Sequence, residues 1–118
     1  MAAALERFDC PDPPALWITE TGIKDPSRAG CERVVRRLSQ WARDERVGAV
    51  FQYTLRNDDL FPTGLVSTDL ARSYPVLEVW KAWAQALREA SSQSASDVKP
   101  TITPSIQYCE RTAALGSA

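Results

Sequence analysis

The stretch LWITETGIKDPSRAG, residues 16 to 30, decides the predicted fold. With Ala15, its first part is a short β-rich run, ALWITE, that has apolar side chains on both faces. A strand of this kind is typical of a parallel sheet that is covered on both sides. The residues TGIKDPSRAG (21 to 30) then form a loop that is long for a connection between a strand and a helix. We therefore expect a functional loop at the end of this strand.

Glu20 is the carboxylate of this apolar run, and a buried carboxylate is costly unless it is paired. Strand alternation puts Leu16, Ile18 and Glu20 on one face and Trp17 and Thr19 on the other. If the even-numbered face points into a closed barrel, Glu20 emerges at its mouth and Trp17 packs outward against helices. A single glutamate at a strand end is more often a plain surface residue, and the residues alone leave that alternative open.

The next segments predict a helix and a second strand. CERVVRRLSQWARDER, residues 31 to 46, carries one apolar stripe at helical spacing: Val34, Val35, Leu38, Trp41 and Ala42. Its arginines mostly occupy the other face, which we interpret as solvated. VGAVFQYT, residues 47 to 54, follows as a second apolar run. Strand, helix and strand in this order predict a parallel βαβ unit.

A long polar loop and a second helix complete the predicted unit. The loop is LRNDDLFPTGLVSTDLARS, residues 55 to 73, and the helix is YPVLEVWKAWAQALREA, residues 74 to 90. Pro75 suits the first turn of a helix, where its missing N–H costs nothing. The predicted buried stripe is Leu77, Trp80, Ala84 and Leu87, widened by Val76 and Trp83. Because the helical tryptophans fall at helical spacing, we expect them to pack rather than to bind sugars.

The ends of the chain differ from this middle part. Residues 1 to 7 resemble the last turns of a helix, and DCPDPP, residues 9 to 14, is a proline-rich connector. From Ser91 onward the chain is rich in Ser, Thr, Pro and Gln. We therefore predict one ordered unit over residues 1–91 and a disordered tail over residues 92–118.

Composition excludes several function classes. The 118 residues carry a net charge of −1, which gives no electrostatic case for binding nucleic acid or an anionic membrane. The chain contains no histidine, which removes imidazole metal sites and Ser-His-Asp or Cys-His catalysis. No apolar run approaches the roughly 20 residues of a membrane span. The adjacent acids Asp58 and Asp59 are a weak metal signal without further ligands.

Three cysteines, Cys10, Cys31 and Cys109, are widely separated and form no CxxC pair. This pattern argues against a zinc or redox site. We predict three unpaired thiols, with a Cys10–Cys31 bridge as the alternative.

Two motifs carry a resemblance to a known family. LWITETG resembles the seventh-strand motif of the retaining glycoside hydrolases of clan A, (β/α)8 barrels in which a Glu at the end of strand seven is the nucleophile. Residues 48–83, from GAVFQYT to VWKAW, resemble their eighth strand, active-site loop and closing helix, as in cellulase-like (family 5) and family 39-type members. The resemblance covers residues 8 to about 88.

By position, the resemblance assigns the nucleophile to Glu20. It implies that Tyr53, Arg56, Asn57 and Asp58 line the sugar site, with Tyr53 only slightly favoured over Gln52 as the inward residue. The implied fold class is α/β, and the chain would be the last two βα units of a (β/α)8 TIM barrel. The implied substrate is a polysaccharide or oligosaccharide, and we expect no cofactor. Relatives are often secreted, but the sequence itself does not assign a compartment.

The resemblance also exposes a missing residue. Retaining hydrolysis needs a second carboxyl group about 5 Å from the nucleophile, acting as acid and then base. In the clan it comes from an Asn-Glu pair, and the one asparagine of this chain, Asn57, is followed by aspartate. A whole barrel also takes about 250 residues. We therefore expect a fragment that supplies the nucleophile, is inactive alone, and self-associates through open sheet edges.

Two other interpretations stay open. The chain would be a non-catalytic carbohydrate-binding or assembly module if it kept the cleft loop without the chemistry. Alternatively it would be a small α/β module unrelated to the clan, in which Glu20 is merely a strand-end residue.

Overall fold

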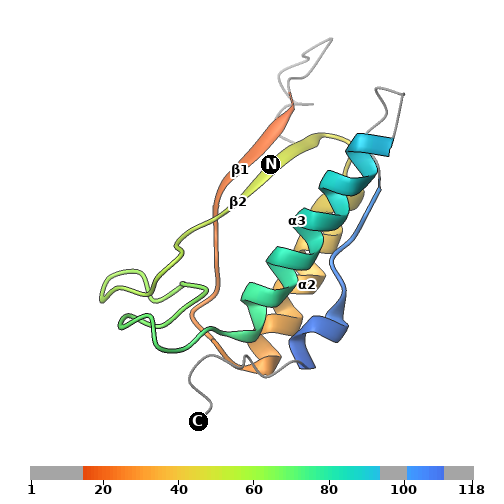
Figure 1. The fold of residues 1–118 in the computed structure, drawn as a ribbon. Helices are drawn as coiled ribbons and strands as arrows, with labels where there is room; N and C mark the ends of the chain where they lie inside the picture. Colours follow the sequence, from red (N-terminus) through yellow and green to blue (C-terminus); the bar gives the residue numbers. More distant parts are fainter. Residues whose placement is uncertain (1–14, 94–100, 111–118) are drawn as a thin grey trace.

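The computed structural model describes residues 15–93 and 101–110 (Figure 1). Along the chain they form β1 (Leu16–Thr21), α2 (Arg28–Arg43), β2 (Val47–Gln52), α3 (Pro75–Gln93) and the short 3₁₀ helix η1 (Ile106–Glu110). Residues 1–14, for which a helix end and a connector were predicted, lie outside the described residues. The predicted α/β class is confirmed.

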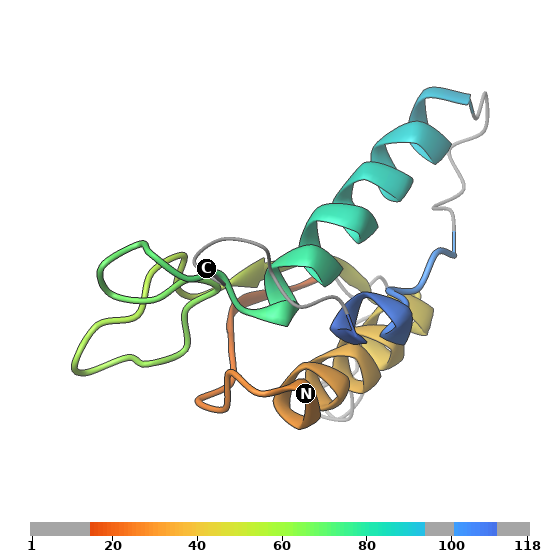
Figure 2. The same cartoon turned by 60° about the horizontal axis from the view of Figure 1, so that its bottom comes forward.

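The two strands pair in parallel, as predicted for a βαβ unit. In Figure 1 both helices lie on one side of the sheet. The loop between β2 and α3 extends beyond the ends of the strands, and Figure 2 shows that it stands clear of the helices. One face of the sheet is thus covered by helices, and the described residues place no layer on the other.

The helix α2 begins three residues before the predicted start because Ser27 caps it. The Ser27 hydroxyl accepts a hydrogen bond from the Gly30 N–H at 3.3 Å, which satisfies one of the free donors of the first turn. The helix ends at Arg43, where the Asp44 N–H donates to the Trp41 carbonyl. The predicted apolar stripe is confirmed, with Val35, Leu38 and Ala42 buried and Val34 and Trp41 packed beside them.

The buried stripe of α3 differs from the predicted one. Val76, Val79 and Trp83 are the buried residues of this helix, whereas Ala84 is exposed. The buried residues follow the line of Val76, Val79 and Trp83 because α3 packs both against α2 and against the segment of residues 101–110. The packing role predicted for the helical tryptophans is confirmed: Trp83 is 8% exposed, and Trp80 packs against the core.

The prediction of a disordered tail is wrong for residues 101–110. This segment lies along the helices in Figure 1 and ends in η1. A disulfide joins Cys109 to Cys31, with a Cα–Cα distance of 5.7 Å. The prediction of three unpaired thiols is therefore wrong, and so is the alternative Cys10–Cys31 bridge. The polar composition of residues 101–110 did not indicate that they are ordered, because this segment is held in place by a covalent bond and by neighbouring apolar residues.

The predicted facing of β1 is also wrong. Ile18 pairs in register with Val50, whose side chain packs against the cluster of Leu38, Ala42 and Trp83. Side chains at paired positions share a face, so Ile18, which is 7% exposed, points to the helices. Trp17 lies on the other face and is 63% exposed, instead of packing against helices as predicted.

Candidate functional site

Glu20 lies at the end of β1 with its side chain exposed. The pairing register between the strands shifts between Ile18 and Thr21, so strict alternation does not carry over from Ile18 to Glu20. A local irregularity of this kind changes the direction of the side chains that follow it. If strict alternation continued from the buried Ile18, the Glu20 side chain would point to the helices. Because of the irregularity, this direction does not follow for Glu20.

The ends of the two strands lie side by side. Thr21 pairs with Gln52, and the Tyr53 N–H donates to the Thr21 carbonyl at 2.7 Å. Because parallel strands end at the same edge, this bond puts Glu20 and Tyr53 at neighbouring positions of that edge. The structure thus brings the backbone beside Glu20 against the backbone of Tyr53, and a shared role of the two side chains stays a prediction.

Gly22 makes this close approach feasible. A Cβ atom at this position would lie 2.5 Å from the Tyr53 carbonyl oxygen and 2.8 Å from the Thr63 Cβ. The Thr63 hydroxyl also donates to the Tyr53 carbonyl at 2.6 Å. The end of β1, the end of β2 and the following loop therefore meet at one compact point.

Gln52 and Tyr53 have different roles at this edge. The Gln52 amide donates to the carbonyls of Thr54 and Thr63, at 3.2 and 2.6 Å, and so holds the loop. The Tyr53 ring is 38% exposed and contacts Phe61 edge-on, with 5.3 Å between ring centroids. Of the two residues weighed from the sequence, Tyr53 is the one whose side chain is available to a ligand.

Asn57 holds the loop together from inside. Its Oδ1 accepts a hydrogen bond from the Gly64 N–H at 2.6 Å, and its Nδ2 donates to the Tyr74 hydroxyl at 3.0 Å. Asp58 has a similar local task, since its Oδ1 accepts from the backbone N–H groups of Leu60 and Phe61. These partners indicate that Asn57 and Asp58 shape the loop, and their predicted contact with a sugar stays a prediction.

Arg56 is the predicted site residue with the most accessible charge. Its side chain is exposed and forms no ion pair within the described parts of the chain. Its backbone is fixed by a bridge to Val66, and its carbonyl accepts from the Thr54 hydroxyl. A cation on a fixed backbone beside Tyr53 can donate hydrogen bonds to a polar ligand.

Two pairs of exposed aromatic rings lie on β1, on β2 and on the loop that follows β2. Trp17 and Phe51, from the two strands, have ring centroids 6.0 Å apart, and Phe51 is 46% exposed. Tyr53 and Phe61 form the second exposed pair.

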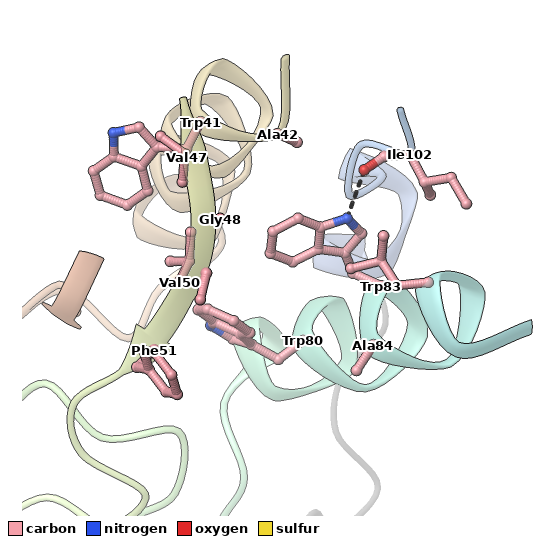
Figure 3. Close-up of a pocket in the computed structure, with 12 residues that line it drawn as sticks. Trp41, Ala42, Val47, Gly48, Val50, Phe51, Trp80, Trp83, Ala84 and Ile102 are labelled. Atoms are coloured by element: carbon pink, nitrogen blue, oxygen red, sulfur yellow. Dashed lines mark hydrogen bonds between the residues drawn. The ribbon is translucent and has the colours of Figure 1, made fainter. Parts of the chain in front are cut away.

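An apolar groove lies on the helix side, between β2 and α3 (Figure 3). It encloses about 290 Å³ and has Val47 to Phe51 along one wall and Trp80, Trp83 and Leu87 along the other. The Trp83 indole N–H donates to the Ile102 carbonyl at 2.7 Å, whereas the buried Trp80 indole nitrogen has no hydrogen-bond partner among the described residues. The groove contains no charged lining residue, so it offers packing surface rather than catalytic groups.

Two arginines of α2, Arg33 and Arg37, line a small pocket of about 160 Å³ with Thr21 and Gly22 at the end of β1. Arg33, Arg36, Arg37 and Arg43 are exposed, as predicted for a solvated face. The Arg33 guanidinium pairs with the Asp25 carboxylate at 2.6 Å. Hydrogen bonds from Ser27, first from its side chain and then from its backbone, together with Arg33, hold the pKa of Asp25 below its ordinary value.

The described residues form neither a metal-binding cluster nor a membrane-spanning helix. In residues 15–93 and 101–110, no group of three or more cysteine or acidic side chains is placed to hold a metal ion. Within the same ranges, neither helix has the length and apolar character needed to cross a lipid bilayer.

Comparisons of the chain with protein-family models, with curated proteins and with solved structures find no match. Function is therefore argued from the geometry at the strand ends and from the motif resemblance.

Proposed function

We propose that the chain is part of a retaining O-glycoside hydrolase of clan A that acts on polysaccharides or oligosaccharides, with Glu20 as its nucleophile. In this proposal β1 and β2 are strands seven and eight of a (β/α)8 barrel. The observation that supports it best is the adjacency of Glu20 and Tyr53 at the ends of two parallel strands. In parallel α/β folds, active sites form at this edge from the loops that follow the strands.

The chemistry is a double displacement. The Glu20 carboxylate attacks the anomeric carbon, and the bond to the leaving oxygen breaks as an acid outside the described residues protonates it. Water then attacks the glycosyl ester, the same outside group takes its proton, and Glu20 is released as the carboxylate. Tyr53 and Arg56 would contact the sugar hydroxyls, and the loop built on Asn57 and Asp58 would hold these two residues in place.

A second candidate is a non-catalytic carbohydrate-binding module. The specific observation in its favour is the presence of two exposed aromatic pairs, Trp17 with Phe51 and Tyr53 with Phe61. Sugar rings present C–H groups that pack against exposed aromatic surfaces, while Tyr also offers a hydroxyl. In this candidate function, Trp17 contacts the sugar and Glu20 has no catalytic role.

The proposal is tested in a chimera in which residues 15–91 of this chain replace the last two βα units of an intact clan A hydrolase. We expect hydrolysis of an aryl glycoside that Glu20→Gln lowers by about 10⁴-fold or more. The matched control is Glu45→Gln, since Glu45 is an exposed glutamate that precedes β2, at the opposite end of the sheet. Equal activity of the two variants would contradict the proposal.

Chemical rescue separates the nucleophile from a merely structural residue. In the Glu20→Gly chimera, added azide should restore consumption of the activated glycoside and give a glycosyl azide of inverted configuration, because azide attacks from the vacated side. Binding of oligosaccharide by the 118-residue chain that Trp17→Ala abolishes and Glu20→Gln leaves unchanged would favour the binding module instead.

A further inference from the structure

We infer that the Cys31–Cys109 disulfide is a structural tether that fixes residues 101–110 over α2 and α3, and that the chain matures in an oxidising compartment. This inference concerns a part of the molecule away from the strand ends. It does not depend on the proposed function.

Both sulfur-bearing residues are buried in the core. Cys31 and Cys109 are each 2% exposed, and they belong to one cluster with Val35, Val76 and Val79. Reduction by thiol–disulfide exchange requires a thiolate to reach one of the two sulfur atoms. Burial denies this access in the folded chain, so the bond has the character of a structural disulfide rather than of a catalytic one.

The other attachments of the segment are weaker. The Arg28–Glu110 ion pair, at 2.9 Å, joins side chains that are 61% and 62% exposed, and exposed pairs of this kind contribute little. The 3₁₀ helix η1 has five residues and is too short to be stable by itself. A hydrogen bond from the Trp83 indole N–H to the Ile102 carbonyl is a further attachment. The disulfide closes a sequence separation of 78 residues and is thus the main constraint on where this segment lies.

The tether also shapes the apolar groove. Ile102 lines that groove, and its carbonyl is the acceptor for Trp83, as Figure 3 shows. When a dithiol reduces the bond, the S–S bond breaks, two thiols form, and the dithiol closes to its own disulfide. Residues 101–110 are then free to leave, which removes Ile102 from the lining of the groove and exposes Trp83.

The need for this bond points to the compartment. Disulfides of this structural type form and persist where the environment is oxidising, as in secreted and periplasmic proteins, and are rare in a reducing cytosol. A chain whose C-terminal segment depends on such a bond is expected to be made for the oxidising environment.

The pairing is tested on the 118-residue chain produced in the bacterial periplasm, alkylated without reduction and mapped by mass spectrometry. We expect a peptide pair joined through Cys31 and Cys109, with Cys10 alkylated, and the same joined pair in the Cys10→Ser variant. Any other pairing, or alkylation of Cys31 and Cys109 in native protein, would overturn the inference. This measurement needs no variant of the two paired cysteines, so it holds even if such variants fail to fold.

The tether is tested by hydrogen–deuterium exchange of the double variant Cys31→Ser/Cys109→Ser against Cys10→Ser. We expect exchange at residues 101–110 to rise at least tenfold in the double variant, with a red-shifted tryptophan emission as Trp83 is exposed. Unchanged protection of residues 101–110 would overturn the tether. If the double variant loses protection throughout α2 and α3, the disulfide supports the whole fold and not only residues 101–110. That result would also overturn the inference of a local tether.

Discussion

Gly22 is the residue on which the candidate site depends most directly. It sits where the end of β1 meets the loop after β2, with the Tyr53 carbonyl and Thr63 in the space that a side chain would occupy. Any larger residue must push the two strand ends apart. The close approach of the two strand ends, next to Glu20 and at Tyr53, therefore requires a residue without a Cβ atom at position 22.

Gly22→Ala is expected to lower the free energy of unfolding by about 1–3 kcal/mol, because the new methyl group overlaps the backbone of Tyr53. The measurement is urea unfolding of the 118-residue chain, followed by circular dichroism. Gly48→Ala is the control, since its Cβ would approach the Ala15 Cβ at 3.0 Å and meets no backbone atom as closely. Equal losses for the two variants would argue against a special contact at Gly22.

At the level of single residues, the sequence predicted the positions of the strands better than it predicted their faces, and the roles of Glu20 and Tyr53 stay predictions. Glu20 and Tyr53 were selected by their positions near the strand ends, and the structure brings these ends together. Trp17 was assigned to the wrong face because β1 is apolar on both sides, so hydropathy does not distinguish its faces. The register shift before Thr21 has no signature in the residues.

Among the elements, α2 shows how a local cap defines a helix start. Asp25 accepts the Ser27 N–H at 3.0 Å and pairs with Arg33, while Ser27 caps the helix. These contacts favour the charged carboxylate, so the pKa of Asp25 is lower in the folded chain than in the unfolded one. A carboxylate with a depressed pKa stabilises the fold above its unfolded pKa, and this contribution is lost as the pH falls through the folded pKa.

Asp25→Asn is therefore expected to lower the melting temperature at pH 7, because the amide loses the charge that Arg33 and Ser27 stabilise. The difference from the unsubstituted chain should shrink as the pH falls below about 4, and disappear only below the depressed folded pKa of Asp25, where the carboxyl group is protonated in both states. Melting curves from pH 7 to pH 2.5 measure it. A difference that stays constant over this range would contradict the pKa argument.

Element boundaries were predictable where a cap or a periodic stripe exists, and not elsewhere. The stripe of α2 identified Val35 and Leu38 as core residues. In contrast, η1 has no apolar periodicity of its own, and its position depends on a bond between cysteines 78 residues apart. Long-range covalent pairing is not readable from local pattern, so the ordered part of residues 101–110 was missed.

In the molecule as a whole, the described residues form a two-stranded sheet that has one face covered by the helices and one face open. Parallel sheets are normally covered on both faces, and Trp17, Phe51, Leu55 and Leu60 are exposed here instead. Each strand has one neighbour in the described residues, which leaves an edge on either side. Exposed apolar faces and open edges favour association with further strands.

Trp17→Lys is expected to reduce self-association of the 118-residue chain, because a charged side chain at the centre of the open face must be desolvated on contact. Light scattering coupled to size-exclusion chromatography measures the mass as a function of concentration. Gln85→Lys, on the exposed side of α3, is the control and should change little. An unchanged mass for the Trp17 variant would place the contact elsewhere.

Covalent trapping of the glycosyl-enzyme intermediate tests whether Glu20 is a glycosidase nucleophile. The chimera that carries residues 15–91 is treated with a 2-deoxy-2-fluoro glycoside whose dinitrophenolate leaves without needing an acid catalyst. The account predicts one glycosyl group per chimera, esterified to Glu20 and located by peptide mapping. A label on any other carboxylate, or an unlabelled chimera that still hydrolyses aryl glycosides, would contradict it.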